Sequence, residues 1–139
     1  MQKEIILGER TKKVAGAPFG PYSHGVKVKG SQTLIFIAGQ GAYVNGKLIG
    51  KADVGAQYRQ IMKNMKAILE DAGASMSSIV KMVHYMGPEV TPGSKEYAAI
   101  SEIRRSYIPE DFPVSTMVQV AGFMVEGMLV EVDAIAVLD

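Results

Sequence analysis

The alternation of apolar and polar positions predicts several short strands in the N-terminal third of the chain. Residues 24–30, HGVKVKG, alternate valine with lysine, which is typical of a half-buried strand. Residues 33–40, TLIFIAGQ, predict a second and more continuously apolar strand. Asn45-Gly46 lies between apolar residues and predicts a tight hairpin. A short apolar run at residues 5–7 predicts a first strand.

Two amphipathic helices follow these strands. Asp53 is a typical N-cap residue, and residues 54–72 repeat apolar side chains at three- and four-residue steps. Gly73 is a typical residue after a helix end. A second apolar stripe predicts a helix over residues 94–108, ended by Pro109. The first stripe consists of Val54, Tyr58, Ile61, Met62, Met65, Ile68, Leu69 and Ala72.

Three further strands complete the predicted order of elements. Residues 78–86, 114–120 and 128–137 predict strands, and residues 87–94, GPEVTPGS, predict a long loop. The order predicts an α+β fold with a single sheet and two helices on one face. The chain has 139 residues and no visible linker, so we expect residues 1–139 to form a single domain.

The last two strands also predict an association between copies of the chain. We expect their β-branched or small faces to pack beneath the helices; these faces are Val114, Thr116, Val118 and Val120, and Val130, Val132, Ala134 and Ala136. The opposite face would then carry Ser115, Met117, Glu131 and Asp133, with no third helix to cover it. Such a face is usually buried against another copy of the same chain, so we expect an oligomer.

The composition excludes several kinds of chemistry. The chain has no cysteine, which rules out disulfides and thiolate nucleophiles, and its two histidines have no recognisable metal spacing. A net charge of +1 and scattered lysines give weak support for nucleic-acid binding. The polar start MQKEIILGERTKK lacks a signal-peptide pattern, and no long apolar run predicts a membrane span. We therefore expect a cytoplasmic protein without metal.

A few residues are candidates for chemistry or for structure. Glu131 and Asp133 are either an acid–base pair or a solvated or ion-paired strand face. His84 lies in an apolar strand, where a buried histidine is more common than a base. The loop GAPFGPYSHGV, residues 16–26, places Tyr22 and His24 in a segment stiffened by prolines. Four methionines, Met62, Met65, Met82 and Met86, are expected to fill gaps in the core.

The whole chain resembles the Rid (RidA/YjgF) family of imine and enamine deaminases. GPYSHGVKV resembles the GPYSQAV signature of that family, and LIFIAGQ resembles its LVFVSGQ strand. FPVSTMVQV and LVEVDAIAV resemble its closing PARS and VEIEAIA motifs. The resemblance implies a chorismate-mutase-like fold (Bacillus type), a homotrimer around a closed barrel, and sites between subunits.

The resemblance also implies roles for individual residues. Tyr22 would line the pocket, and Glu131 would hold the attacking water. Gly39 and Gln40 belong to the strand that borders the site, and His24 replaces the usual glutamine of the loop. No cofactor is used in the family.

This sequence departs from the family pattern at the substrate site. The arginine that clamps a substrate carboxylate is replaced by Ser115, and the following cysteine by Met117. Ala38 stands at the serine of the SGQ strand, and Ser101 stands at the helix asparagine. Arg104, on the second helix, does not match the clamp. On these grounds the pocket has lost its cation, and the loop at residues 87–94 looks longer than usual.

Three functions remain open from the sequence. The leading hypothesis is a trimeric hydrolase of a reactive imine or enamine that lacks a carboxylate at the usual place and so differs from the usual 2-imino acids. Tyr22 and Glu131 would be its catalytic residues; the substrate-binding candidates are Ser115, Met117, Ala38, Gly39, Gln40, Ser101 and His24. The alternative is a non-catalytic, regulatory protein that binds a small metabolite. A third possibility, an endoribonuclease-like activity, has little support from the near-neutral charge.

Overall fold

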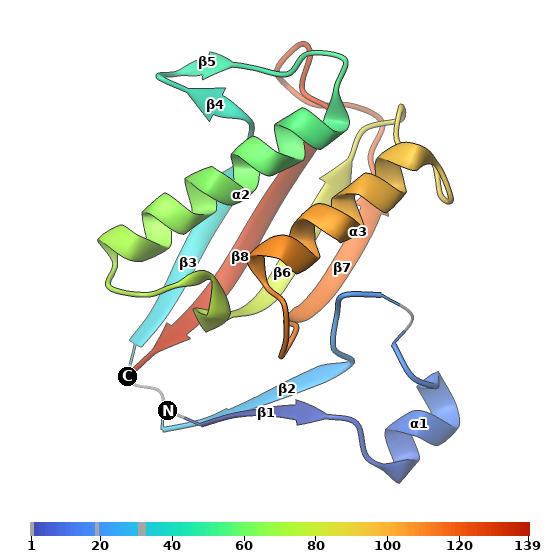
Figure 1. The fold of residues 1–139 in the computed structure, drawn as a ribbon, viewed down its shortest axis with the longest axis vertical. Coiled ribbons are helices and arrows are strands. Elements are labelled where there is room, and N and C mark those ends of the chain that lie inside the picture. The colour runs from blue at the N-terminus through green and yellow to red at the C-terminus, as the bar shows by residue number, and fades with distance from the viewer. Residues whose placement is uncertain (1, 19, 31–32) are drawn as a thin grey trace.

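The computed structural model describes residues 2–18, 20–30 and 33–139. Four strands form the main sheet in the order β3-β8-β6-β7, and helices α2 and α3 cover one of its faces (Figure 1). β7 runs parallel to β6, whereas β8 is antiparallel to both β3 and β6, so the sheet is mixed. The bounds are β3 Thr33–Gln40, α2 Val54–Asp71, β6 Ile79–Met86, α3 Lys95–Tyr107, β7 Val114–Gln119 and β8 Val130–Leu138. The expected α+β class is confirmed.

The N-terminal segment forms a separate two-stranded unit. β1, Gln2–Ile6, pairs with β2, Gly25–Lys29, and this pair lies beyond one end of the main sheet (Figure 1). Lys3 fastens the unit to the main domain, because its Nζ donates to the backbone carbonyls of Ser77, Ile79 and Asp111 at 3.0 to 3.3 Å. Burial lowers the pKa of Lys3. The strands therefore do not all join the single continuous sheet that the sequence predicted.

A short helix in this unit was not predicted. α1, Glu9–Ala15, has no buried residue, so it shows no apolar stripe from which a helix could be recognised. It carries Glu9 in its first turn and two lysines in its last, which suits the helix dipole. A 3₁₀ turn at Met76–Ser78 also precedes β6.

The two predicted helices and the hairpin are confirmed. Asp53 caps α2 by accepting a hydrogen bond from the Ala56 backbone N–H at 3.0 Å. Ser94 caps α3 in the same way, accepting from the Tyr97 N–H at 3.2 Å. The hairpin joins β4, Tyr43–Val44, to β5, Lys47–Leu48. Its two turn residues have positive φ, 51° at Asn45 and 75° at Gly46, as the Asn-Gly signal requires.

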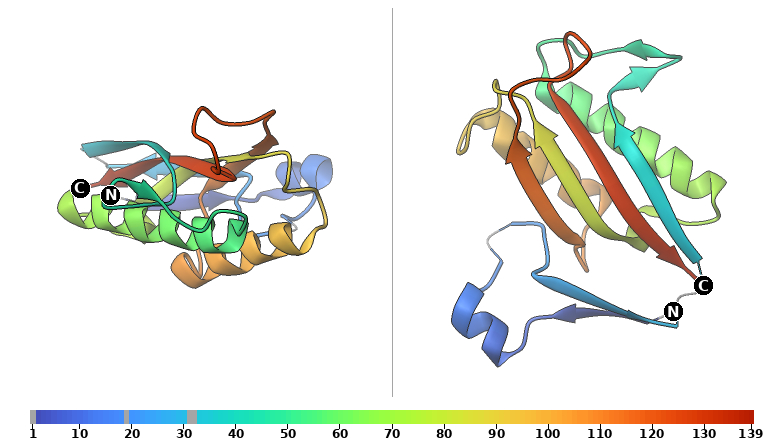
Figure 2. Two further views of the ribbon diagram at one scale, coloured as in Figure 1. Left: turned by 90° about the horizontal axis from the view of Figure 1, so that it is seen from above. Right: turned by 180° about the vertical axis from the view of Figure 1, so that it is seen from behind.

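The core lies between the main sheet and the two covering helices. The predicted inner face of β8 is confirmed, because Val130, Val132, Ala134 and Ala136 are all buried. The four methionines expected in the core are buried as well. The opposite face of β8 carries Glu131 and Asp133, and none of the described helices covers it (Figure 2).

The predicted faces of β7 are wrong. β7 pairs with β6 in a register that places Ser115 beside Met82 and Met117 beside His84, and both β6 residues are buried beneath the helices. Ser115 and Met117 therefore face the helices, while Val118 points to the open face and is 42% exposed. The valine-rich face of β7 was misleading because apolar character alone does not say what covers it.

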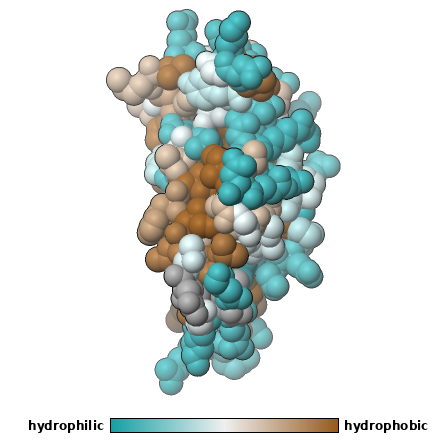
Figure 3. All heavy atoms as spheres, turned by 90° about the vertical axis from the view of Figure 1, so that its left-hand side faces the viewer, coloured by the Kyte–Doolittle hydropathy of each residue, from teal (hydrophilic) through white to brown (hydrophobic). Residues whose placement is uncertain are grey.

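Apolar side chains also gather at the β3 edge of the sheet, on the side of the molecule shown in Figure 3. Leu34 and Phe36 are 59% and 72% exposed. They pair with Val137 and Ile135 of β8, which places them on the open face. Among the described residues, no helix has the length and apolarity needed to cross a membrane.

One buried polar pair links the sheet to α2. The Tyr58 hydroxyl lies 2.9 Å from His84 Nε2, and both residues are fully buried. Burial, and secondarily the charge of Arg104, lowers the pKa of His84 to about 3. The histidine is therefore neutral in the folded protein at neutral pH, as expected for a structural residue.

We predict that acid destabilises the protein through His84. The unfolded chain takes up a proton at this histidine near the ordinary histidine pKa of 6.5, and the folded protein does so only near pH 3. The free energy of unfolding should therefore fall as the pH drops from 6.5 towards 3, by at most about 1.4 kcal/mol per pH unit. Urea unfolding across this range should show a shallower slope for His84→Gln than for wild type. Equal slopes would contradict this assignment.

Candidate functional site

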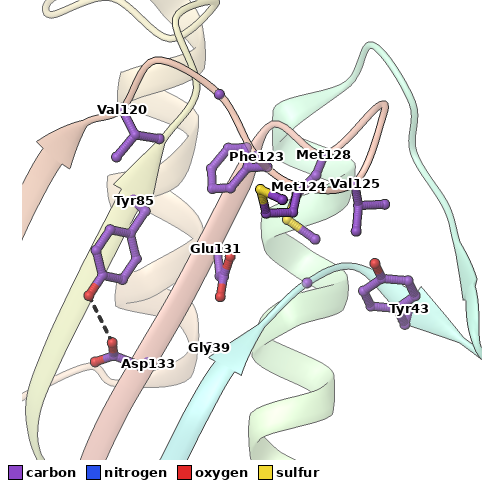
Figure 4. A pocket seen from close by; sticks show the side chains of 12 residues that line it. Gly39, Tyr43, Tyr85, Val120, Phe123, Met124, Val125, Met128, Glu131 and Asp133 are labelled. Atoms are coloured by element: carbon purple, nitrogen blue, oxygen red, sulfur yellow. Dashed lines mark hydrogen bonds between the residues drawn. The ribbon is translucent and has the colours of Figure 1, made fainter.

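A cavity of about 610 Å³ lies on the open face of the sheet. Its floor holds Glu131 and Asp133 of β8 and Tyr85 of β6, and the segment between β7 and β8 forms its roof (Figures 2 and 4). The roof and walls contribute mostly apolar side chains, namely Tyr43, Val120, Phe123, Met124, Val125 and Met128. Two carboxylates thus lie in a partly apolar recess.

The two carboxylates have different surroundings. Tyr85 donates a hydrogen bond from its hydroxyl to Asp133 Oδ2 at 3.0 Å, and this bond raises the pKa of Tyr85. The Asp133 carboxylate therefore already has a hydrogen-bond partner on the neighbouring strand of the sheet. Glu131 lines the same cavity, and no hydrogen bond joins it to the other residues drawn in Figure 4. Of the two, Glu131 is better placed to contact a bound molecule.

Gly39 allows Glu131 to take this position. β3 has an irregular register between Ile37 and Gln40, so residues 38 and 39 lie in a bulge. A Cβ atom on Gly39 would lie 1.8 Å from Glu131 Oε1, so a larger residue at position 39 would force the Glu131 side chain to move. The carboxylate therefore lies directly against the backbone of β3, in the position that a Cβ atom on residue 39 would occupy.

A second cavity of about 490 Å³ lies between β7 and α3, on the helix side of the sheet. Its lining residues are Tyr22, Met86, Val90, Pro92, Tyr97, Arg104, Ser115, Met117, Val118 and Gln119. The loop at residues 87–94 forms one wall, because Gln119 Nε2 donates to the Val90 carbonyl at 2.9 Å and holds it against β7. The longer loop noted in the sequence therefore shapes this cavity.

The loop at residues 16–26 brings Tyr22 into the second cavity. The Ser23 backbone N–H donates to the Pro113 carbonyl at 3.0 Å, and the Ser23 hydroxyl donates to the Phe112 carbonyl. His24 Nε2 lies 3.0 Å from the Gly16 carbonyl and closes the loop on itself. Ser23 and His24 therefore position the loop. Phe19 of this segment lies outside the described residues.

Arg104 is a functional candidate that was left out of the predicted site because it does not match the clamp of the family motif. It lies on α3 and lines the second cavity, where its Nη1 donates to the Ser115 hydroxyl at 3.0 Å. Ser115 Oγ also lies 3.4 Å from His84 Nδ1. The expectation that this pocket lacks a cation is wrong, because the guanidinium enters from the helix rather than from β7. The spacing of Tyr97 and Arg104, two helical turns apart, was the available signal.

The predicted site residues fall into two separate groups. Tyr22, Ser115 and Met117 line the second cavity, whereas Gly39 and Glu131 line the first. The remaining candidates line neither cavity; they are Ala38, Gln40, Ser101 and His24. The Ala38 carbonyl accepts a hydrogen bond from Gln40 Nε2 at 3.0 Å. One copy of the chain therefore does not bring Tyr22 and Glu131 together.

The described residues include no group of three or more histidine, cysteine or acidic side chains that could hold a metal ion.

Comparisons with known proteins show the family to which the chain belongs. The model of the Endoribonuclease L-PSP family matches residues 12–138. A RutC family protein of Pyrococcus abyssi is 34% identical over 138 residues, which cover 98% of both chains. A 2-iminobutanoate/2-iminopropanoate deaminase of Dermatophagoides farinae is 28% identical over 127 residues, or 91% of this chain and 92% of the relative.

A solved structure is similar over nearly the whole chain. The crystal structure of YyfB from Yersinia pestis, a Rid family protein described as having unknown function, is 31% identical. The match covers 99% of this chain and 100% of YyfB with a TM-score of 0.84. On sequence and fold together, the chain belongs to the Endoribonuclease L-PSP family, which includes the RutC and Rid proteins.

Proposed function

We propose that the protein hydrolyses a reactive imine or enamine to a carbonyl compound and ammonia, in a cleft formed between two copies of the chain. The observation that carries the proposal is the Glu131 carboxylate, held against Gly39 beneath an apolar roof. A carboxylate in such a recess can accept a proton from a water molecule. The deaminase name of the Dermatophagoides farinae relative supports the same reaction class.

The proposed reaction needs one base and one water molecule. Glu131 accepts a proton as the water oxygen bonds to the carbon of the C=N group, and the nitrogen takes up a proton. The hydroxyl proton of the resulting amino alcohol then passes to the nitrogen, the C–N bond breaks, ammonia leaves, and the oxygen forms a C=O group. An enamine enters the same path after protonation at carbon, which converts it to the imine.

A homotrimer would supply the two halves of this cleft. Tyr22 and Glu131 lie in different cavities of one copy, so joint action requires a second copy. The exposed Leu34 and Phe36 on β3, and the open face of β7 near Val118, offer the apolar surface that an interface needs. A barrel of three copies would cover these surfaces and the open faces of all three sheets.

The second cavity suggests how the substrate differs from the usual small 2-imino acids. Its volume of about 490 Å³ and its walls of Met86, Val90 and Met117 offer room for an apolar substituent. The guanidinium of Arg104 enters this cavity from α3 rather than from β7. We therefore propose a substrate with a larger apolar group than a methyl or ethyl chain.

A non-catalytic role in binding a metabolite is the second candidate. The observation that favours it is the structural use of His24 and His84, which leaves Glu131 as the one clear base candidate among the described residues of the two cavities. Turnover of imines generated in place by amino-acid and amine oxidases separates the two functions. Binding without any acceleration over buffer would favour the regulatory role.

We predict that Glu131→Gln lowers kcat for imine hydrolysis by about a hundredfold or more, because the amide does not accept the proton of water. Asp133→Asn is the matched control, since Asp133 already accepts a hydrogen bond from Tyr85. It should retain most of the activity. Rates of imine loss measured for both variants give the comparison, and similar rates for Glu131→Gln and wild type would refute the role of Glu131.

We also predict that Gly39→Ala lowers the same rate strongly, because its Cβ would displace the Glu131 carboxylate. Gly122→Ala provides the control within the same cavity, since a Cβ there meets nothing within 4 Å. Steady-state kinetics should show the loss mainly in kcat for Gly39→Ala. Equal losses in the two variants would mean that the position of Glu131 is not what matters.

Two copies of the chain should each supply one side chain to a shared cleft. Tyr22→Ala and Glu131→Gln should each be nearly inactive alone. Unfolded together and refolded as a mixture, they should recover about a quarter of wild-type activity, because about one cleft in four then receives both native side chains. Light scattering should give a trimer throughout. A mixture as inactive as its two components would show that the residues do not act in a shared cleft.

A further inference from the structure

Arg104 is a buried cation without an acidic partner among the described residues. The residue is 4% exposed, and the ion pairs found in the described part of the chain involve lysines instead. Its Nη1 donates to Ser115, while its Nε is buried and has no hydrogen-bond partner among the same residues. Buried charges in proteins are normally paired or fully hydrogen-bonded. The surroundings of this guanidinium are therefore incomplete.

The groups around Arg104 do not neutralise it. Burial raises the pKa of Tyr58, so that this phenol on α2 stays protonated. His84 on β6 is neutral at neutral pH, and Ser115 on β7 offers a hydroxyl. Burial lowers the pKa of Arg104, and the positive charge of Arg105, next along α3, lowers it further. An arginine nevertheless remains charged at neutral pH.

The guanidinium lines the second cavity rather than a closed part of the core. Tyr22 and Tyr97 lie in the same lining, and the remaining wall is largely apolar, with Met86, Val90 and Met117. A cavity with one cation, a few hydroxyl groups and an apolar wall matches a small molecule that has one anionic end and one apolar end. A planar guanidinium suits a carboxylate particularly well.

We propose that Arg104 binds the carboxylate of a small-molecule ligand in the second cavity, with the apolar part of the ligand against Met86, Val90 and Met117. The proposal rests on the proposed function only in treating this cavity as part of the substrate cleft; it does not require turnover. The Ser115 hydroxyl positions the guanidinium through the 3.0 Å hydrogen bond. A short side chain at residue 115 also leaves room for an arginine that arrives from α3.

The experiment measures binding rather than activity, with two stable probes of equal shape. Isothermal titration compares 4-methyl-2-oxopentanoate, a carboxylate with an apolar chain, with its neutral primary amide. Wild-type protein should bind the carboxylate about tenfold or more tightly than the amide. Arg104→Gln should lose this preference. Arg105→Gln is the matched control, because it removes one exposed positive charge from the next position, and it should keep the preference.

Stability separates ligand binding from a structural role. Without a probe, Arg104→Gln should have a Tm equal to or above that of wild type, since it removes an unpaired buried charge. Arg104→Lys keeps the charge and should still prefer the carboxylate, with lower affinity. The proposal is overturned if Arg104→Gln binds the carboxylate as wild type does, or if Arg104→Lys shows no preference.

The same measurements distinguish this proposal from the proposed reaction. Carboxylate binding that depends on Arg104, together with no hydrolysis of any imine, would support the binding role and count against the deaminase. If Arg104→Gln hydrolyses imines and binds the carboxylate as wild type does, the deaminase would be supported and the binding role of Arg104 would be refuted.

Discussion

The pairing of β6 with β7 and β8 is the constraint on which the rest of the structure depends. Side chains alternate between the two faces of a strand, so a register fixes the face of every residue at once. The register with β6 turns Ser115 towards the helices, and the register with β8 turns Glu131 to the opposite face. The two halves of the candidate site therefore lie on opposite faces of one sheet. A shift of one residue in either pairing would bury the carboxylate or expose the serine.

The fold could be predicted from the sequence wherever a residue pattern has a local cause. The Asp53 cap, the stripe of α2 and the Asn45-Gly46 turn each depend on neighbours within a few residues, and each is found in the structure. α1 could not be predicted, because a helix that buries no residue shows no stripe. The faces of β7 could not be predicted either. Valines suit a helix-covered face and an interface between copies equally well, and the strand itself does not distinguish the two coverings.

The candidate site could be predicted only in part. The resemblance identified Tyr22 and Glu131 as site residues, and the structure places each in the lining of a cavity. The role of Arg104 could not be inferred by matching positions, because a guanidinium that enters from a helix has no counterpart in a strand motif. The importance of Gly39 could not be predicted from the sequence either. Its importance follows from the distance between its missing Cβ and the Glu131 carboxylate, which no sequence pattern contains.

The strand order also determines when the sheet can form during synthesis. β8 lies between β3 and β6 and pairs with both, yet it follows them in the chain. Until β8 leaves the ribosome, the strands that it joins have no shared neighbour, and the Lys3 side chain lacks its most distant carbonyl partner until Asp111 is made. Contacts between such distant parts of a chain close slowly. The nascent protein therefore carries β3 without its β8 partner through most of its translation.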